Sequence, residues 1–311
     1  MGQGAGADGL VVVSTAVDCY SPRGGVSWDM IVHLIDGTYE LFRHFYGLRR
    51  MKQQPDPPLG AMTGVLRTVV QMLDTGATHI GVATDHVIES FRNELFADYK
   101  TGEGIDPVLH AQFHPLEEAL TAMGVATWPM VELEADDGLA SAAHLAALNP
   151  AVEKVSIWTP DKDLAQCVVG DRVVQVDRRS GQVRNADAIK AKYGVIPALI
   201  PDYLALVGDS ADGYPGIAGI GAKTAAQLIN RYGRIEDFPP EVLGANTEAA
   251  LLFKTLATLR TDAPLFADVE QIRWSGATAS FPSWAERMGD ARLAAKVQEL
   301  ETRLAAKAAS E

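Results

Sequence analysis

The chain has 311 residues, of which 47% are hydrophobic and 22% are charged, an ordinary composition for a globular protein with room for two domains. No apolar run approaches the roughly 20 residues of a membrane span, and the seven histidines and two cysteines lack metal-site or disulfide spacing. We therefore expect no membrane contact, zinc site or disulfide framework, and the formal charge of −13 excludes a broadly basic surface, so that any contact with nucleic acid has to be local.

Residues 1–29 differ in composition from the rest of the chain. They are rich in Gly, Ala and Ser, show no steady periodicity, and lack the basic start and apolar segment of a signal peptide. We expect a mostly disordered extension before a domain that begins at Met30, and a cytoplasmic location. For the apolar run Val11–Val13, an edge strand is the alternative.

From Met30 onward, β-prone and amphipathic segments alternate along the chain. Strands are predicted at 31–36, 79–85, 125–128 and 154–159, followed by a strand pair within 172–184. Helices are predicted near 38–50, 60–74, 112–123, 134–148 and 161–168, with a Pro-rich turn at 55–58. This alternation predicts an α/β fold over residues 30–185, in which helices cover both faces of a parallel sheet, and a helical region over 186–311.

Residues 86–115 interrupt the alternation. Their periodicity is weak, and they hold five acidic residues against two basic ones. A segment of this length without clear secondary structure inside a compact domain is usually functional. We expect a long functional loop or a mobile helical arch.

Carboxylates stand at the ends of successive predicted strands. Asp36 and Asp85 end the first two strands, and Glu134 opens the helix at 134–148. Two closely spaced pairs follow, each able to point both carboxylates into one pocket. The complete set is Asp36, Asp85, Glu134, Asp136, Asp137, Asp161, Asp163, Asp209 and Asp212.

Each of these carboxylates alone is most simply explained as a helix cap or a turn residue. Their repetition needs another explanation, because the carboxyl ends of parallel strands lie along one edge of a sheet, where α/β folds bind ligands. Nine carboxylates converging there repel one another unless divalent cations hold them. Oxygen ligands without His or Cys select Mg²⁺ or Mn²⁺, so we predict a two-metal phosphodiesterase site. We do not expect a dinucleotide site, because no GxGxxG follows the first strand.

A glycine-rich segment in the second half of the chain is the other strong signal. Gly216, Gly219 and Gly221 precede a predicted helix that contains Lys223. Glycines let a backbone approach a phosphate closely, and a helix start points free N–H groups outward. The segment is typical of a helix–hairpin–helix contact with a DNA backbone, and an ordinary glycine-rich connection between helices is the alternative. A Walker A pattern is absent.

The order and spacing of these motifs resemble those of the 5′ nuclease (flap endonuclease) superfamily, and closely those of the N-terminal 5′–3′ exonuclease domain of bacterial DNA polymerase I. The resemblance runs from about Met30 to about Val269 and includes Ser90–Arg92, Tyr99–Lys100 and Arg260–Leu265. It implies a PIN-like core with an arch near 86–115. It also implies a helical helix–hairpin–helix (H3TH) region at 186–311 that contributes Asp209 and Asp212 to the active site.

The resemblance also implies roles for residues at matching positions. Asp36, Asp85, Glu134, Asp136 and Asp161 correspond to ligands of one metal, and Asp163, Asp209 and Asp212 to ligands of a second, with Asp137 nearby. Phe42 corresponds to an aromatic residue on which a base near the scissile bond stacks. Arg43, Arg92 and Lys100 correspond to cations that face the scissile phosphate. Gly216, Gly219, Gly221 and Lys223 match a hairpin that grips the uncleaved duplex, where relatives hold a potassium ion.

The function implied by the resemblance is that of a stand-alone, monomeric 5′–3′ exonuclease and flap endonuclease of DNA replication and repair. Its substrates would be DNA with 5′ flaps, nicks or 5′ ends, RNA-primed ends included. Glu103 stands where relatives often carry a basic residue, the segment 86–115 is acidic, and Gly213 replaces a usual asparagine. Two alternatives stay open: a structure-specific DNA-binding protein with weak or lost catalysis, and a PIN-domain ribonuclease.

Apolar residues recur at helical spacing near the C-terminus. Leu293, Val297, Leu300 and Leu304 fall at positions i, i+4, i+7 and i+11 and predict an amphipathic helix. We expect this helix to pack on the protein's own surface, with a contact to a partner protein as the alternative.

Overall fold

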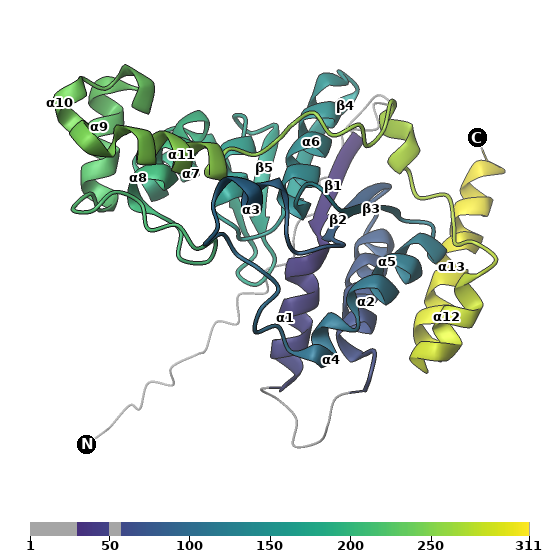
Figure 1. The fold of residues 1–311 in the computed structure, drawn as a ribbon. Coiled ribbons are helices and arrows are strands. Elements are labelled where there is room, and N and C mark those ends of the chain that lie inside the picture. The colour runs from purple at the N-terminus through teal and green to yellow at the C-terminus, as the bar shows by residue number, and fades with distance from the viewer. Residues whose placement is uncertain (1–29, 50–56, 311) are drawn as a thin grey trace, which may run out of the picture.

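A computed structural model describes residues 30–49 and 57–310 (Figure 1). The expectations for residues 1–29, with the edge strand at Val11–Val13, and for the first half of the turn at 55–58 lie outside the described residues. Six strands form one sheet in the order β3-β2-β1-β4-β5-β6, parallel except for β6. The strands are β1 (Met30–Asp36), β2 (His79–Asp85), β3 (Ala126–Met130), β4 (Val152–Trp158), β5 (Val173–Asp177) and β6 (Gln182–Arg184).

Helices cover both faces of the sheet, which confirms the predicted α/β class. One face carries α1 (Gly37–Arg49), α2 (Gly60–Asp74) and α5 (Phe113–Ala122), and the other carries α6 (Ala135–Leu148). Successive side chains along β1 point to opposite faces of the sheet, so the strand can pack against both sets of helices. Ile35 packs with the first group of helices, whereas Val32 and Leu34 pack with α6, and all three are fully buried.

The parallel order places the carboxyl ends of β1, β2 and β4 side by side. β2 and β3 lie on one side of β1, while β4 and β5 lie on the other, so the order of connection reverses between β1 and β4. Open α/β sheets bind ligands at such a reversal, outside the carboxyl ends of the strands. Asp36 ends β1 and Asp85 ends β2, so both carboxylates begin at this edge.

One predicted helix has a different form in the structure. The segment predicted as a helix near 161–168 is a short 3₁₀ helix, η1 (Asp163–Cys167). Immediately before it, the Asp163 backbone N–H donates to Oδ1 of Asp161 at 3.0 Å. Such a local side-chain bond gives the backbone an alternative to a regular helical start, and Asp161 lies two residues before Asp163, the first residue of η1.

A second, helical region follows the sheet. It comprises α7 (Ala186–Tyr193), α8 (Ile200–Val207), α9 (Ala222–Tyr232), α10 (Pro240–Leu243) and α11 (Thr247–Ala257), and it lies to one side of the sheet in Figure 1. Its core, which includes Leu204, Phe253 and Leu256, is separate from the cores on the two faces of the sheet. Tyr99 also enters this core. The segment 86–115, which contains α3 (Phe91–Leu95) and α4 (Pro107–His110), therefore connects the two regions.

After α11 the chain returns to the sheet. Leu259, Val269 and Ile272 join the core on the α6 side of the sheet. The last two helices, α12 (Phe281–Met288) and α13 (Ala291–Ala308), pack against α2 and α5 at the opposite end of the molecule from α9 and α10 (Figure 1). Residues 186–257 are thus an insertion between two parts of one α/β body.

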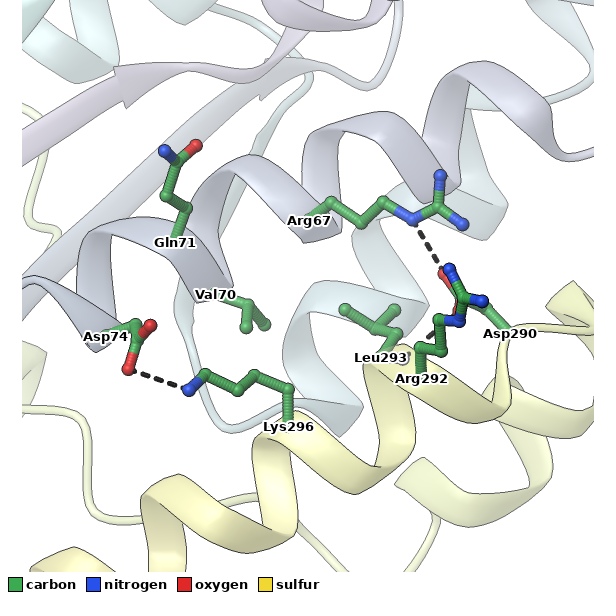
Figure 2. A pocket seen from close by; sticks show the side chains of 8 residues that line it. All are labelled: Arg67, Val70, Gln71, Asp74, Asp290, Arg292, Leu293 and Lys296. Atoms are coloured by element: carbon green, nitrogen blue, oxygen red, sulfur yellow. Dashed lines mark hydrogen bonds and ion pairs between the residues drawn. The ribbon is translucent and has the colours of Figure 1, made fainter.

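The C-terminal helix packs on the protein's own surface, as predicted. Leu293, Val297 and Leu300 are buried, whereas Leu304 is 36% exposed. A pocket of about 410 Å³ lies between α2 and α13, and none of its lining residues is among the nine predicted carboxylates. Figure 2 shows its lining side chains. Two ion pairs cross the pocket, Arg67 to Asp290 at 2.7 Å and Lys296 to Asp74 at 3.0 Å. Within residues 30–49 and 57–310, no helix has both the length and the apolar character needed to span a membrane.

Replacing Leu293 with alanine is expected to lower the free energy of unfolding by about 2–5 kcal/mol, because the leucine side chain is 4% exposed and its removal leaves a cavity. Urea denaturation followed by circular dichroism measures the change. Leu304→Ala is the matched control on the same helix, and its half-exposed side chain predicts a change within about 0.5 kcal/mol. Equal midpoints for the two variants would contradict the packing of α13.

Candidate active site

Asp36 is buried at the end of β1 and also begins α1. Its Oδ1 accepts from the Tyr39 backbone N–H at 2.8 Å, as a helix-capping carboxylate does, and its Oδ2 accepts from the Thr159 hydroxyl at 3.0 Å. Burial and the neighbouring Asp85 and Asp161 raise the pKa of Asp36 to about 7, although the Tyr39 amide opposes this rise. A carboxylate in this setting is stabilised by added positive charge.

Asp85 and Glu134 connect the end of β2 to the start of α6. Oδ1 of Asp85 accepts from the Ala135 backbone N–H at 2.8 Å, and burial raises the pKa of this carboxyl. Glu134 accepts from the Ser90 hydroxyl at 2.7 Å. Burial opposes the charge of Glu134, but Lys100 and Arg92 outweigh it and lower the pKa of that carboxyl. Hydrogen bonds from Ala135 and Ser90 therefore fix the positions of the Asp85 and Glu134 carboxylates.

Two groups of carboxylates lie within the reach of one cation each. In the first group, oxygens of Asp136, Asp161 and Asp163 all lie within 4.8 Å of one another, and in the second the same holds for Asp163, Asp209 and Asp212. Asp163 belongs to both groups. Its Oδ1 is buried and has no hydrogen-bond partner among residues 30–49 and 57–310, although such atoms are normally satisfied.

The electrostatics of these groups favour a bound cation. Burial, and then the surrounding carboxylates, raise the pKa of Asp136 and of Asp163 well above the usual range. The donors are carboxylate oxygens, the ligands that Mg²⁺ and Mn²⁺ take. An unsatisfied buried oxygen, mutual repulsion and an all-oxygen donor set together fit a site for hard divalent ions.

Two lysines lie against these carboxylates. Lys100 Nζ is 2.7 Å from Oε2 of Glu134 and 3.2 Å from Oδ1 of Asp212. Burial disfavours its charge, but Glu134 and Asp212 raise the pKa of Lys100 well above its ordinary value. Lys162, which the sequence analysis did not single out, lies 2.7 Å from Oδ2 of Asp209. Its place between Asp161 and Asp163 was the signal available.

Arg92 and Asp137 take positions that differ from those predicted. Arg92 is 1% exposed, and its guanidinium donates to both oxygens of Asp137, to Glu134, and to the backbone carbonyls of Leu256 and Thr258. Five N–H groups are thereby all used, so none is left to face a scissile phosphate.

Asp137 is likewise fully engaged. Its two oxygens accept from Arg92 and from the backbone N–H groups of Glu134 and Arg260. These contacts occupy the carboxylate that the sequence predicts as a metal ligand. The pair instead joins α3, α6 and the segment after α11 in the interior of the protein.

Phe42 and Arg43 project from the middle of α1. Phe42 is half-buried and meets the ring of Phe113 edge-on, with centroids 6.1 Å apart. Arg43 is bound to Glu40, which is fully buried one turn after Asp36. The stacking role of Phe42 and the substrate contact of Arg43 stay predictions.

The glycine-rich segment forms a tight turn beside the second carboxylate group. Gly216 has φ +69°, and a Cβ there would lie 2.3 Å from the backbone nitrogen of Gly208, so only glycine fits. Gly219 has φ +83° with open space around it, and Gly221 caps α9. Lys223 is exposed in the first turn of α9.

The same loop holds the aspartates of the second group. The Asp209 backbone N–H donates to the Tyr214 carbonyl at 2.8 Å, and the Lys100 backbone N–H donates to the Asp212 carbonyl at 3.0 Å. Asp209, Asp212 and the glycine turn therefore form one connected unit between α8 and α9. Gly213, where the sequence departs from the family pattern, has φ +91° and lies against the Asp98 carbonyl, which a side chain would displace.

Comparison with protein families gives two matches that follow one another along the chain. Residues 31–194 match the 5′-3′ exonuclease N-terminal resolvase-like domain, and residues 195–280 match the 5′-3′ exonuclease C-terminal SAM fold. A 5′-3′ exonuclease of Buchnera aphidicola is 30% identical over 261 residues, which cover 78% of this chain and 90% of the relative. One of Aquifex aeolicus is 32% identical over 255 residues, covering 78% and 86%. DNA polymerase I of Pseudomonas aeruginosa is 33% identical over 259 residues, but the chain spans only 28% of that relative's length.

Solved structures share the fold. T5 5′-exonuclease with bound zinc ions superposes with a TM-score of 0.59 at 18% identity, covering 88% of this chain and 98% of that one. The catalytic core of Rad2 in complex with DNA substrate superposes with a TM-score of 0.56 at 14% identity, covering 89% and 92%. The PIN-like sheet with a helical C-terminal part is thereby confirmed.

The family rests on the sequence matches. The two family models together span residues 31–280 without a gap, and the two exonucleases named above match over most of their own length. The chain belongs to the 5′-3′ exonuclease family.

Proposed function

We propose that the protein hydrolyses phosphodiester bonds of DNA at 5′ ends and at 5′ flaps, using Mg²⁺ or Mn²⁺ held by the two carboxylate groups. The observation that carries this proposal is Asp163, which belongs to both groups and keeps one buried oxygen that has no hydrogen-bond partner in the described part of the chain. The likeness to 5′-3′ exonucleases over most of their length supports it. The DNA-bound Rad2 structure, which has the same fold, supports the class of substrate.

We divide the predicted carboxylates into those that would bind an ion and those that would orient the site. Asp136, Asp161 and Asp163 would hold one ion, and Asp163, Asp209 and Asp212 the other. Ions held there supply Lewis-acid activation of water and neutralise charge on the phosphate. Asp36, Asp85 and Glu134, whose oxygens accept from Tyr39, Ala135 and Ser90, would orient the site around them.

Lys100 would act on the phosphate as a fixed positive charge. It is held by Glu134 and Asp212 at the border between the sheet and the helical region, and its raised pKa keeps it protonated. A protonated ammonium stabilises negative charge that develops on phosphate oxygens and cannot serve as a base. These contacts support Lys100, rather than the buried Arg92, as the residue that we propose for the scissile phosphate.

Duplex DNA would bind at the glycine turn. The exposed Gly219, Gly221 and Lys223 at the start of α9 offer backbone N–H groups and one cation to a phosphate. Because the chain carries a charge of −13, this contact has to be local, and we expect affinity for DNA to fall as the salt concentration rises. By likeness to its relatives we further propose potassium at this turn, activity on nicks and RNA-primed ends, and a cytoplasmic monomer in DNA replication and repair.

A 5′-flap duplex labelled at the flap 5′ end tests the proposal. The protein is incubated with Mg²⁺, Mn²⁺ or EDTA, and product lengths are read on a denaturing gel. Cleavage within a nucleotide of the junction, lost in EDTA, is expected. Intact flap binding without product in either metal would favour a DNA-binding protein without catalysis, for which the acidic segment around Glu103 is the motivating feature. Cleavage of single-stranded RNA but not of the flap would favour a PIN-domain ribonuclease.

Adding Mg²⁺ or Mn²⁺ without DNA is expected to raise the melting temperature by several degrees. Ligand at 100 times its Kd stabilises a protein by about 2.7 kcal/mol, and about 1 kcal/mol shifts a melting temperature by roughly 2–4 °C for a chain of this size class. Differential scanning fluorimetry with and without EDTA measures the shift. Asp163→Ala should abolish it, whereas the same shift in that variant would place the ions elsewhere.

A further inference from the structure

Glu40 is a buried carboxylate beside the active site that the proposed mechanism leaves unexplained. Its side chain is fully buried in the first turn of α1, four residues after Asp36. Arg43 binds it with two hydrogen bonds, Nε to Oε1 at 3.1 Å and Nη2 to Oε2 at 2.5 Å. Arg178, which follows β5, approaches from the sheet with its Nε 3.7 Å from Oε1. One carboxylate therefore lies between two guanidinium groups.

His44 holds Arg43 from the other side. Nε2 of His44 lies 2.9 Å from Nη2 of Arg43 and 3.0 Å from the Thr68 hydroxyl. An arginine offers only donors, so this nitrogen accepts and the imidazole is neutral. Burial and the nearby arginines lower the pKa of His44 to about 4, in agreement. Gly64 makes the room, because a Cβ there would lie 2.4 Å from Nδ1 of His44.

These contacts use only part of each guanidinium. In Arg43, Nε and Nη2 point to Glu40 and His44, and Nη1 has no hydrogen bond to any described residue, while the side chain is 28% exposed. In Arg178 the guanidinium lies over the Trp158 ring at 4.4 Å and Nη2 contacts Sδ of Met72 at 2.7 Å. Its Nε is buried and has no hydrogen bond to a described residue, and the side chain is 18% exposed. Both arginines are held from inside, and Nη1 of each has no hydrogen bond to any described residue.

The charge and the position of this cluster suit a phosphate. With neutral His44, two guanidiniums and one carboxylate leave a net charge of +1. Arg43 lies seven residues beyond Asp36, or about 10 Å along α1, a length that corresponds to roughly three nucleotides of one strand of B-form DNA. The backbone of Arg43 is therefore separated from that of Asp36 by a length that suits a neighbouring phosphate of the same strand.

We propose that Glu40 is a positioning residue, which holds Arg43 and Arg178 together as a two-guanidinium site for a backbone phosphate of the substrate strand a few nucleotides from the cut. The proposal rests on the proposed nuclease function. The site selects for a nucleic-acid backbone rather than a base, because its donors form planar forks that match phosphate oxygens. A buried ion pair that serves stability alone is the competing explanation.

The test compares Glu40→Gln, Arg178→Ala and Arg43→Ala on the 5′-flap duplex. Cleavage is measured at single turnover with saturating protein, and binding is measured as Kd in Ca²⁺ over a range of salt concentrations. Arg178→Ala and Arg43→Ala are each expected to weaken binding and to reduce the slope of log Kd against log salt by about 1. Glu40→Gln removes a negative charge, so its Kd should not weaken, but the released arginines misplace the strand and the single-turnover rate should fall about tenfold.

Two controls separate positioning from stability. Glu40→Gln in a background lacking both arginines should have no further effect on the rate, since the residues it positions are gone. Asp202→Asn, which alters a buried acid bound to Lys254 in the helical region, should lower the melting temperature and leave the rate of the folded protein unchanged. A Glu40→Gln variant that behaves like Asp202→Asn, or whose rate loss persists without the arginines, would overturn the proposal.

The salt slopes keep the inference separable from the nuclease function. If the wild-type protein binds the flap without cutting it, the proposed function fails, and unchanged slopes in Arg178→Ala and Arg43→Ala would then overturn the phosphate site as well. If the wild type cuts the flap and both slopes are unchanged, the nuclease function stands and the phosphate site fails.

Discussion

Replacing Asp163 with alanine is expected to lower the single-turnover cleavage rate by on the order of 10³-fold or more. The residue belongs to both carboxylate groups, so its loss removes a ligand from each. Metal-assisted stabilisation of the transition state contributes several kcal/mol, and each 1.36 kcal/mol corresponds to about tenfold in rate. The rate of flap cleavage in saturating Mn²⁺ is the measurement.

The fold of this variant should survive. Asp163 is buried beside Asp161, Asp209 and Asp212, so removing its charge relieves repulsion, and the melting temperature in EDTA should not fall. Asp187→Ala makes the same chemical change at an exposed site on α7 and should cleave like the wild type. A loss of only tenfold in Asp163→Ala, with metal binding retained, would show that the two groups do not depend on a shared ligand.

Replacing Arg92 with methionine is expected to lower the free energy of unfolding by about 3–5 kcal/mol. The substitution leaves Asp137, which is fully buried, without its ion-pair partner, and uncompensated buried charge carries that cost. It also removes the donors to the Leu256 and Thr258 carbonyls. Urea denaturation measures the loss, and Arg260→Met, which breaks only an exposed ion pair with Asp262, should leave the midpoint nearly unchanged.

A second variant decides between the two roles for Arg92. Arg92→Met combined with Asp137→Leu removes both charges and should recover part of the lost stability, as replacement of a whole buried pair often does. If Arg92→Met instead folded as stably as the wild type and lost cleavage alone, the role predicted from the sequence, a cation facing the scissile phosphate, would be restored.

The features that the sequence predicts well are those set by local pattern. The strand at 79–85 and the helix at 60–74 have the predicted bounds, because the strand is a buried, β-prone run that stops at Asp85 and glycines stand at both ends of the helix, Gly60 and Gly76. The convergence of Asp36 with Asp161 follows from strand ends that parallel pairing brings to one edge. The local sequence pattern, together with the rule that parallel strands end at one edge of a sheet, is enough to predict these features.

The features that the sequence does not predict depend on partners far apart in the chain. Arg92 is buried because its partners lie 45 residues away at Asp137 and more than 160 residues away at Leu256 and Thr258. Glu40 meets Arg178 because β5 pairs with β4, which in turn pairs with β1, the strand that precedes α1. The return of residues 258–280 to the sheet has no periodic signal. The spacing of motifs predicts which residue types lie near the site. Burial and hydrogen bonding to distant partners determine which of their atoms can still contact a substrate.

The return of the chain after α11 determines how the two regions can come apart. Five consecutive residues there are held by side chains of the α/β body: Arg92 binds the carbonyls of Leu256 and Thr258, Gln166 binds Ala257 and Leu259, and Asp137 binds the Arg260 amide. Separating residues 256–260 from these side chains would leave several buried polar groups without hydrogen bonds at once. The helical region is therefore not joined to the sheet by a flexible linker at this point. In amide hydrogen exchange, we expect the amides of Leu259 and Arg260 to become exposed together with those of the sheet, as one cooperative unit.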